Sequence, residues 1–382
     1  MKKRYCALII IAALLTGMFV LAIHIQSVKA NTITVPDDYP TIQGAINAAN
    51  PDDTIYVRAG TYVENVIVNK TICLIGEDRI STKLYGTTNE PIVIVEANDV
   101  KISGFAFVGW GVFKNIVINA TTGVIIVGNR IPFGATGIDV ENSDNVTIED
   151  NTITGFGLGN IGVMLAYSSE CSIVNNTIRN AVYNGIRLWF SSGNLIHQNL
   201  IKNNDYGIFF HEANLNIMSE NTISESGTSG IFLESASSGN KFVHNNFIAN
   251  WTAVRIYDNM PNIWDDGYPS GGNYWSVYDR RDLFKGVHQN ETGSDGIGDT
   301  LHNIGENNRD NYPLMIPWGN LLGDVNEDGY VDIDDIFLVA SHFSKKLGDP
   351  DYSRTYDLNG DGYIGIDDIF TVASHFGEEE TP

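Results

Sequence analysis

Residues 176–211 read NTIRNAVYNGIRLWFSSGNLIHQNLIKNNDYGIFFH. One pattern occurs twice here, because Asn-x-Ile appears at Asn176–Ile178 and again at Asn199–Ile201. A Gly-Ile pair follows each copy, at Gly185-Ile186 and Gly207-Ile208, and opens a run in which inward and outward positions alternate. Alternation with a period of two is typical of strands that bury one face. The stretch therefore predicts several short strands within each repeat.

The same repeat continues on both sides, at spacings of 22 to 25 residues. Asn-x-Ile begins at Asn129, Asn151, Asn176, Asn199, Asn221 and Asn246. A small residue and an aliphatic one follow at Gly137-Ile138, Gly162-Val163, Gly185-Ile186, Gly207-Ile208, Gly230-Ile231 and Ala253-Val254. Units this short, rich in Gly and Asn, are typical of single coils of a parallel β-helix. Because coils stack about 4.8 Å apart, we expect the Asn side chains to form a structural hydrogen-bonded ladder at one corner.

Earlier coils are predicted from the short apolar runs Thr54–Val57, Val66–Val68 and Ile72–Ile75. Before them, residues 41–49 have the pattern of a short amphipathic helix with Thr41 as its N-cap. A solenoid must cover its exposed end, and we expect this helix to do so.

The composition excludes several classes of function. The 382 residues include 23 basic and 46 acidic ones, for a net charge of −23, whereas binding to nucleic acid or to anionic membranes needs a basic surface. The 40 Asn and 38 Gly residues, with only 18% charged residues, also argue against a helical bundle.

Residues 1–30 are predicted to be a signal peptide. Met1–Arg4 is basic, Ala7–Ile23 is apolar, and Val28-Lys29-Ala30 precedes the expected cleavage point. Because the apolar region is longer than usual, an uncleaved anchor stays open as the alternative. We expect a secreted protein associated with the cell surface, with no lipid contact beyond this segment.

Two cysteines remain outside the signal, Cys73 and Cys171, both in apolar strand-like contexts. Buried free thiols are the expectation, and a disulfide stays open. The chain also has six Asn-x-Ser/Thr sequons, where an exported protein could carry glycans. They begin at Asn69, Asn119, Asn145, Asn175, Asn250 and Asn290.

Residues 31–316 resemble right-handed β-helix proteins of the pectin lyase-like type. The similarity rests on Val35-Pro36 before the helix, on Gly60–Glu64 after the first strand, and on the coils, which resemble the NosD and carbohydrate-binding/sugar-hydrolase (CASH) branch. The closing block of that branch is similar to Gly272–Trp275, Asp295–Asp299 and Asp310–Met315.

The resemblance implies an all-β right-handed parallel β-helix over residues 31–262, with an N-terminal capping helix, and a C-terminal cap over 263–319. A small all-α domain with EF-hand-like loops is expected over residues 320–382.

This last segment carries a duplicated acidic motif. Asp324–Phe343 matches Asp357–Phe376 at 15 of 20 positions, and each copy opens with Asp-x-Asn-x-Asp-Gly and has an acid at loop position twelve. That spacing is the one with which EF-hand loops supply oxygen ligands to Ca²⁺. The predicted calcium ligands are Asp324, Asn326, Asp328, Tyr330 and Asp335 in the first loop and Asp357, Asn359, Asp361, Tyr363 and Asp368 in the second. The segment holds 15 acids and three bases, so we expect its folding to depend on the ion.

A calcium loop followed by one helix, in duplicate and closed by Asp, resembles a type I dockerin. The expected apolar stripes are Ile336, Phe337, Ala340 and Phe343, and their counterparts Ile369, Phe370, Ala373 and Phe376. The resemblance implies a cohesin-like partner or a cell-surface scaffold. In that family, loop positions ten and eleven help to select the partner, and here they are Ile333-Asp334 and Ile366-Asp367. Near-identical copies would permit two binding orientations; binding to another protein, or within this chain, stays open.

Alignment of the strands after each small-aliphatic pair predicts two columns on one outer sheet face. One column is Asp139, Met164, Arg187, Phe209, Phe232 and Arg255, and the other is Glu141, Ala166, Trp189, His211, Glu234 and Tyr257. Aromatic faces stack on sugar rings, and Arg binds carboxylates with two hydrogen bonds. The predicted ligand-binding residues are Arg187, Trp189, Phe209, His211, Phe232, Glu234, Arg255 and Tyr257.

His211 and Glu234 lie on adjacent coils and are the candidate catalytic acid and base, whereas Asp139 and Glu141 are expected to lie too far from them. A carboxylate pair, or Lys or Arg with Asp on adjacent coils, would favour an enzyme, and only the His211–Glu234 pair is identified. The NosD resemblance implies copper, but the histidines do not cluster with Met or Cys, so no copper site is expected.

Three functions remain open. The first is a polysaccharide-binding surface protein that its calcium-dependent dockerin attaches to a partner. The second is a scaffold-attached polysaccharide lyase or O-glycosyl hydrolase. The third is a structural spacer without a ligand.

Overall fold

The computed structural model describes residues 30–87, 90–109, 114–155, 160–278, 281–326 and 328–379, without the side chain of Phe133. The predicted signal peptide, residues 1–30, lies almost entirely outside the described residues. None of the described helices combines the length and the apolar character needed to cross a membrane.

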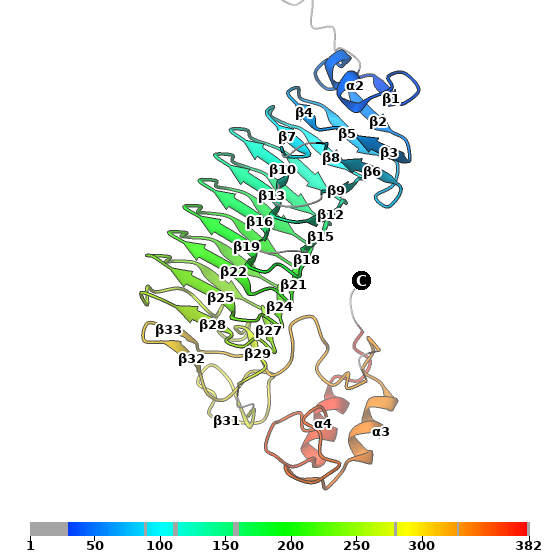
Figure 1. Ribbon diagram of the computed structural model, residues 1–382. Helices are drawn as coiled ribbons and strands as arrows, with labels where there is room; N and C mark the ends of the chain where they lie inside the picture. The colour runs from blue at the N-terminus through cyan, green and yellow to red at the C-terminus, as the bar shows by residue number, and fades with distance from the viewer. Residues whose placement is uncertain are drawn as a thin grey trace, which may run out of the picture.

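Most of the chain forms a right-handed parallel β-helix, as predicted, in which successive coils add one strand to each of three sheets (Figure 1). Sheet A contains β1 (Thr32–Val35), β2 (Thr54–Val57), β5 (Cys73–Gly76), β8 (Lys101–Ser103), β11 (Ile125–Val127), β14 (Thr147–Glu149), β17 (Ser172–Val174), β20 (Leu195–His197), β23 (Ile217–Ser219) and β26 (Lys241–Val243). Sheet B contains β3 (Gly60–Val63), β6 (Thr82–Tyr85), β9 (Ala106–Val108), β12 (Arg130–Phe133), β15 (Thr152–Gly155), β18 (Thr177–Arg179), β21 (Leu200–Lys202), β24 (Thr222–Ser224), β27 (Asn246–Ile248) and β29 (Tyr274–Trp275). Sheet C contains β4 (Val66–Val68), β7 (Val93–Val95), β10 (Lys114–Asn119), β13 (Thr136–Glu141), β16 (Ile161–Ala166), β19 (Asn184–Trp189), β22 (Tyr206–His211), β25 (Ser229–Glu234) and β28 (Val254–Ile256).

The predicted asparagine ladder lies at the corner between sheets A and B. At Asn199, Nδ2 donates to Oδ1 of Asn221 at 3.0 Å, and Oδ1 accepts from the backbone N–H of Asn176 at 2.9 Å. The ladder runs through Asn129, Asn151, Asn176, Asn199, Asn221, Asn245 and Asn273. Because these amides are buried and fully bonded, the ladder is structural, as expected.

The prediction was wrong at one member of this ladder. Asn245 occupies the ladder position instead of Asn246, because Phe247 takes the inward place that Ile holds two residues after the other ladder asparagines. A second buried ladder, which the repeat did not reveal, lies between sheets C and A. It runs through Asn194, Asn216, Asn240 and Asn262.

The small residue before each aliphatic position is required by the spacing of the coils. A Cβ atom on Gly162 would lie 2.5 Å from the carbonyl oxygen of Gly185, and one on Gly207 would lie 2.4 Å from that of Gly230. A non-bonded carbon and oxygen cannot approach so closely, so these glycines let the coils stack at their normal distance.

Both ends of the solenoid are covered. At the N-terminal end, α2 (Ile42–Ala48) buries Ile42, Ala45 and Ile46, and the Thr41 side chain accepts from the backbone of Gly44 as the predicted N-cap. At the other end, Trp264 stacks on Phe242 and Trp275 stacks on Phe247. The cap also contains two short hairpins, β30 (Phe284–Lys285) with β31 (Glu291–Thr292) and β32 (His302–Gly305) with β33 (Asn308–Asp310).

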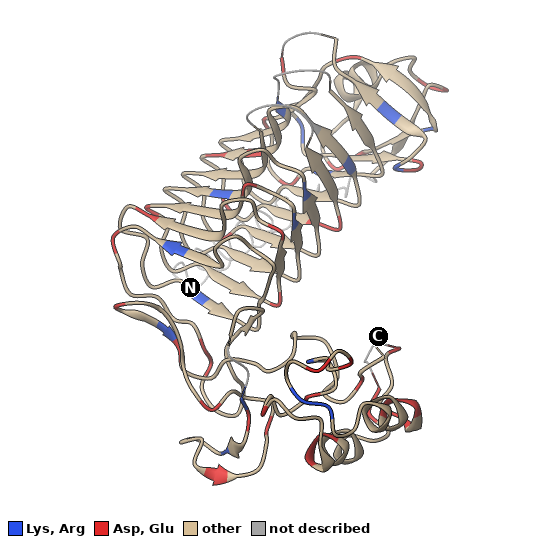
Figure 2. Ribbon diagram, turned by 60° about the horizontal axis from the view of Figure 1, so that its bottom comes forward, with Lys and Arg blue, Asp and Glu red and all other residues tan. Residues whose placement is uncertain are grey.

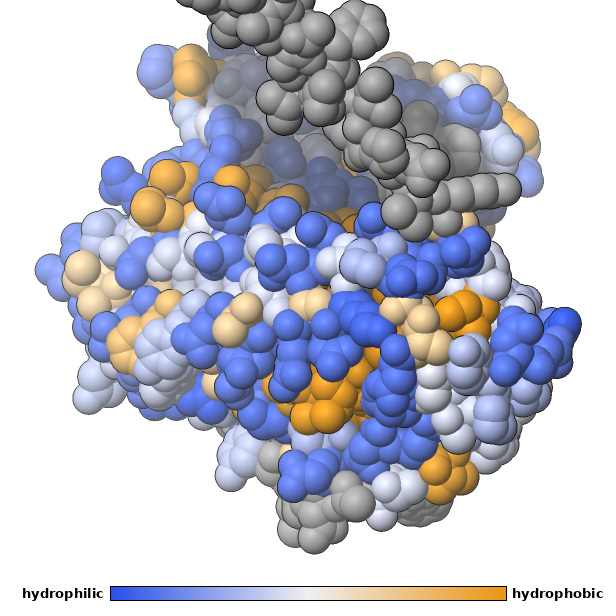
Figure 3. Space-filling model, turned by 90° about the horizontal axis from the view of Figure 1, so that it is seen from above, coloured by the Kyte–Doolittle hydropathy of each residue, from blue (hydrophilic) through white to orange (hydrophobic). Residues whose placement is uncertain are grey.

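The C-terminal domain packs two helices, α3 (Ile333–Ser341) and α4 (Ile366–Ser374), around a small core. The core comprises Val325, Val331, Val339, Ile364 and Val372. The predicted apolar stripes lie largely outside it, because Phe337 and Phe370 are 66% and 64% exposed. Acidic residues gather around this domain (Figure 2). The surface seen from above is mostly hydrophilic with scattered apolar groups (Figure 3).

Candidate functional site

The strands of sheet C align the two predicted columns. Arg187 pairs in register with Met164 and Phe209, and Trp189 pairs with Ala166 and His211. The remaining pairings align Asp139 with Met164, Phe209 with Phe232, Phe232 with Arg255, Glu141 with Ala166, and His211 with Glu234. Tyr257 follows β28 directly and continues the second column. We call the residues from Arg187 to Tyr257 in these columns the sheet C strip.

Arg187 lies at the centre of this strip, between two aromatic rings. Its guanidinium carbon is 4.4 Å from the ring centroid of Trp189 and 5.2 Å from that of Phe209. Among the described residues Nε is buried without a hydrogen-bond partner, and burial lowers the pKa of this side chain. Stacking orients the guanidinium, and Nη1 and Nη2, unlike the buried Nε, can donate to a ligand.

His211 contacts both the aromatic part of the strip and a carboxylate. Its ring lies 3.7 Å from that of Trp189, centroid to centroid, and its Nδ1 is 2.9 Å from Oε2 of Glu234. The two predicted catalytic side chains are therefore in direct contact. An imidazole and a carboxylate at this distance can share and transfer a proton.

The C-terminal part of the strip is also aromatic. Arg255 lies 5.0 Å from the ring centroid of Phe232, and the ring of Phe232 stacks on Tyr206 at 5.6 Å. Tyr257 is 74% exposed. The sequence analysis does not include Tyr206 in the strip, although its place directly before the Gly-Ile pair of its coil indicates a position beside the two columns.

A second charged cluster lies three coils nearer the N-terminus on the same face. Lys114 makes ion pairs with Asp139 and, at 2.7 Å, with Glu141. Asp139 is buried, which raises its pKa, whereas the hydrogen bond from Lys114 lowers the pKa of Glu141. This is a Lys-with-Asp pair on adjacent coils, and the aligned columns do not reveal it, because in register Lys114 lies beside Thr136 and Asp139 lies beside Val117. Asp139 is only 1% exposed, whereas the side chains of Lys114 and Glu141 are 41% and 36% exposed, so the cluster is an ion-pair network at the surface with one buried carboxylate.

The first predicted calcium loop is closed by Asp335. This buried carboxylate accepts from the backbone of Val325 at 2.9 Å and of Asp332 at 2.8 Å, and Asp324 accepts from Gly329 at 2.9 Å. Gly329 has a φ of 87°, which allows the sharp turn at loop position six.

The second loop repeats this geometry with Asp357 and Asp368. Asp368 accepts from Leu358 at 2.8 Å and Gly365 at 2.7 Å, and burial raises its pKa to about 6. Oδ1 of Asp357 is buried and has no hydrogen-bond partner among the described residues. A buried, unsatisfied carboxylate oxygen beside other oxygen donors fits a hard divalent cation, which would offset the cost of burying these charges.

The predicted partner-binding pairs lie at the first turns of α3 and α4. Ile333 and Ile366 are 50% and 52% exposed. Asp334 and Asp367 follow them on the surface. Exposed apolar side chains at equivalent places of the two copies form two similar surfaces.

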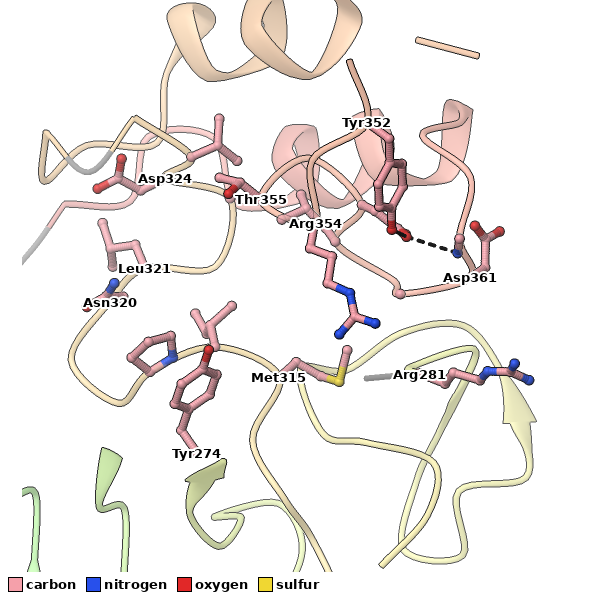
Figure 4. A pocket seen from close by; sticks show the side chains of 18 of the residues that line it. Tyr274, Arg281, Met315, Asn320, Leu321, Asp324, Tyr352, Arg354, Thr355 and Asp361 are labelled. Atoms are coloured by element: carbon pink, nitrogen blue, oxygen red, sulfur yellow. Dashed lines mark hydrogen bonds between the residues drawn. The ribbon is translucent and has the colours of Figure 1, made fainter. Parts of the chain in front are cut away.

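A pocket of about 280 Å³ lies between the solenoid cap and the C-terminal domain. Tyr274 and Met315 line it from the cap, and Tyr352 and Arg354 line it from the C-terminal domain (Figure 4). The two parts also touch directly, because the backbone N–H of Asp282 donates to the carbonyl of Asn359 at 2.9 Å.

Comparisons with known proteins agree with this architecture. Residues 46–280 match the family described as periplasmic copper-binding protein (NosD), and residues 322–376 match the dockerin type I domain. A cell surface glycoprotein of Methanothermus fervidus is 28% identical over 321 residues, which cover 65% of this chain and 53% of that protein. The chain thus spans about half the length of this curated relative.

Two solved structures are similar, and the first of them supports the fold. An alginate lyase from Paenibacillus sp. matches with a TM-score of 0.50 at 16% identity, over 64% of this chain and 97% of that one. ORF18 of Geobacillus virus E2 matches with a TM-score of 0.48 at 12% identity, over 72% of this chain and 67% of that one.

The described residues do not fit the copper in the family's description. His197 contacts Ser219, His211 contacts Glu234 and His244 contacts Ser270. In the described parts of the chain no three His, Cys, Asp or Glu side chains are grouped as a metal site. Copper needs converging imidazole or sulfur ligands, and we derive no step through it.

The family match covers more than half of the chain, and the second match covers both acidic loops and the helices that follow them. The chain therefore belongs to the NosD family and carries a dockerin type I domain at its C-terminal end.

Proposed function

We propose that this is an exported surface protein whose sheet C strip binds polysaccharide and whose dockerin domain attaches it to a cohesin-like partner. The observation that carries the proposal is the arrangement around Arg187. A guanidinium held between Trp189 and Phe209, without an ion pair among the described residues, offers both a stacking surface and hydrogen-bond donors. Sugars carry both complementary features, an apolar ring face and many acceptors.

The strip is long enough for several sugar units. Four strands lie between Arg187 and Arg255 in register, from β19 to β28. At about 4.8 Å per coil, they span about 14 Å along the solenoid axis. A chain of sugars that runs along this axis would meet an aromatic or Arg side chain on β19, β22 and β28, whereas on β25 Phe232 is only 8% exposed and Glu234 is the more accessible group.

The dockerin domain would supply the attachment. Asp324, Asn326, Asp328, Tyr330 and Asp335 would hold one Ca²⁺, and Asp357, Asn359, Asp361, Tyr363 and Asp368 would hold the other. Bound Ca²⁺ would neutralise the loop carboxylates and hold the starts of α3 and α4. Ile333-Asp334 and Ile366-Asp367 would then be presented to the partner. The relative named as a cell surface glycoprotein supports a location outside the cell.

A second candidate function is cleavage of the bound polysaccharide, as a lyase or glycoside hydrolase. The contact between His211 and Glu234 favours it, because this pair lies within the strip and can move a proton. Most glycosidases use two Asp or Glu side chains. Among the described residues, no second carboxylate contacts the His211–Glu234 pair.

One experiment separates these functions. The secreted chain, in Ca²⁺, is applied to a glycan array and incubated with neutral and acidic polysaccharides, with product release measured. Binding without products supports the proposal, and products that disappear in H211A support the enzyme. No binding and no products contradict both and favour a structural spacer.

A further inference from the structure

Three of the six sequons lie on one edge of the solenoid, where the strands of sheet C end and those of sheet A begin. Asn69 directly follows β4, and Asn119 ends β10. Val95 pairs with both Val68 and Ile118, so the two asparagines occupy the same position two coils apart. Two coils correspond to about 10 Å. Asn145 lies in the turn before β14, on the same edge.

These three asparagines are exposed. Their side-chain amides make no hydrogen bond within the described part of the chain, so Nδ2 is accessible on the surface. Asn145 has a φ of 54°, a left-handed conformation that Asn adopts readily in turns. A substituent on any of the three amides would project into solvent without displacing a coil.

Asn250 is a matched contrast, because its half-buried side-chain amide is held by hydrogen bonds to the neighbouring coil. Its Nδ2 donates to the carbonyl of Ile223 at 2.8 Å, and its Oδ1 accepts from the backbone of Ser226 at 3.0 Å. A glycan on this nitrogen would break the contact with Ile223 and push the coil open. At Asn175, Nδ2 donates to Oδ1 of Asp150 at 2.6 Å, so its amide is engaged as well.

The exposed sequons lie on a part of this edge that differs in structure from its C-terminal part. On the coils of β19 to β25 the same edge is formed by the buried amides of Asn194, Asn216 and Asn240. The three exposed sequons of this edge lie on earlier coils, before this ladder begins. A glycan on the edge near β4, β10 and β13 would leave the sheet C strip uncovered.

We propose that Asn69, Asn119 and Asn145 are N-glycosylation sites and that Asn250 is not. The co-reactant is a lipid-phosphate-linked oligosaccharide. Nδ2 forms a bond to the anomeric carbon C1, the bond between C1 and the phosphate oxygen breaks, its electron pair stays on the phosphate, and the amide loses one proton to a base of the transferase. Asn290, exposed on the turn between β30 and β31, meets the same criterion of exposure.

The test is secretion of the full chain from a eukaryotic host that glycosylates Asn-x-Ser/Thr, followed by site-by-site peptide mass mapping. The mapping uses enzymatic deglycosylation in heavy-oxygen water, which marks each occupied site. Glycan on the three edge asparagines with Asn250 bare is the expected result. Bare edge asparagines, or glycan on Asn250 in the folded protein, would overturn the proposal.

Two variants sharpen this test. N119Q should remove one glycan from the intact mass of the secreted protein and leave its circular dichroism unchanged. N250Q should leave the glycan mass of any secreted protein unchanged, because its effect is on folding and secretion. A loss of glycan mass in N250Q would contradict the assignment, and the map of the unmodified sequence decides independently of how well either variant folds.

Discussion

The imidazole of His211 lies parallel to the indole of Trp189, with 3.7 Å between the ring centroids and 6° between the planes. Oε2 of Glu234 lies 2.9 Å from Nδ1 of this imidazole. The guanidinium carbon of Arg187 lies 4.4 Å from the ring centroid of Trp189. The aromatic surface of the strip is thus organised before any ligand binds. A preorganised surface loses less conformational entropy on binding than free side chains do.

We expect W189A to weaken polysaccharide binding about tenfold, which corresponds to about 1.4 kcal/mol. The substitution removes the ring on which both Arg187 and His211 are stacked. Isothermal titration calorimetry with the best glycan from the array measures the change. W251A is the matched control, because Trp251 is 84% exposed and lies outside the strip. Equal losses in both variants would contradict a role for the strip.

R187Q should weaken binding to acidic polysaccharides about tenfold and binding to neutral ones much less. Arg187 has no ion pair among the described residues, so its charge is available to a carboxylate or sulfate. The salt dependence of binding should also become shallower. R179Q, on the exposed end of β18 in sheet B, is the control. If R187Q and R179Q bind acidic chains alike, the guanidinium does not contact the ligand.

N199A should lower the free energy of unfolding by about 2–4 kcal/mol, because buried donors and acceptors above and below it lose their partners. Asn199 donates to Ile173, His197 and Asn221. Denaturant unfolding monitored by circular dichroism measures the loss. N303A is the control, since Asn303 is exposed on β32, and it should change the stability by about 0.5 kcal/mol or less.

Calcium removal should unfold the dockerin domain and leave the solenoid folded. Carboxylates such as Asp335 and Asp368 are buried, and without a cation their charges oppose compaction. Chelator should therefore abolish the helical signal of α3 and α4, and titration should show two Ca²⁺ per chain. D357A should remove one of the two, whereas D351A, at a largely exposed acid, should retain both. An unchanged helical signal in chelator would refute the dependence.

Stability should fall as the pH rises from about 4 to about 7, in part because of Asp310. Burial raises the pKa of this carboxyl to about 7, and the charge of Asp265 acts in the same direction. Since the folded state holds this proton more tightly than the unfolded chain, deprotonation above the unfolded value costs stability, on the order of 4 kcal/mol in full. The loss is complete above pH 7.

Urea unfolding across this pH range tests the effect. D310N should reduce the change of the free energy of unfolding with pH, because the amide side chain carries no proton that titrates in this range. D52N, at an exposed turn residue with a φ of 69°, should keep the slope of the parent protein. If D310N keeps it as well, another group causes the pH dependence.

Local patterns were sufficient to predict much of this molecule. The 22–25-residue spacing, the inward Ile after each Asn and the small residue before each aliphatic one predicted the coils, because each reflects a constraint that one coil places on the next. The calcium loops were equally visible, since their proposed ligands lie within twelve consecutive residues. The columns of the strip followed from the same alignment, because parallel strands in register place equivalent residues side by side.

Contacts that depend on the direction of long side chains were not predictable in this way. Lys114 reaches Asp139 and Glu141 from the start of its strand, where pairing in register would place it beside Thr136. The ladder position of Asn245 required knowing that a Phe fills the inward site. Both Phe337 and Phe370 face solvent because the core of a two-helix domain takes only one face of each helix.

By itself, the sequence determined the repeat, the direction in which each strand residue points and the ligand spacing of the calcium loops, since these depend on residues close together in the chain or one coil apart. Only the tertiary structure decided which charges are buried, which rings stack and which sequon amides are free. Those properties depend on how neighbouring coils and loops cover each side chain. Asn119 and Asn250 carry the same type of sequon, but the Asn119 amide is exposed whereas the half-buried Asn250 amide donates to the carbonyl of Ile223 on the neighbouring coil.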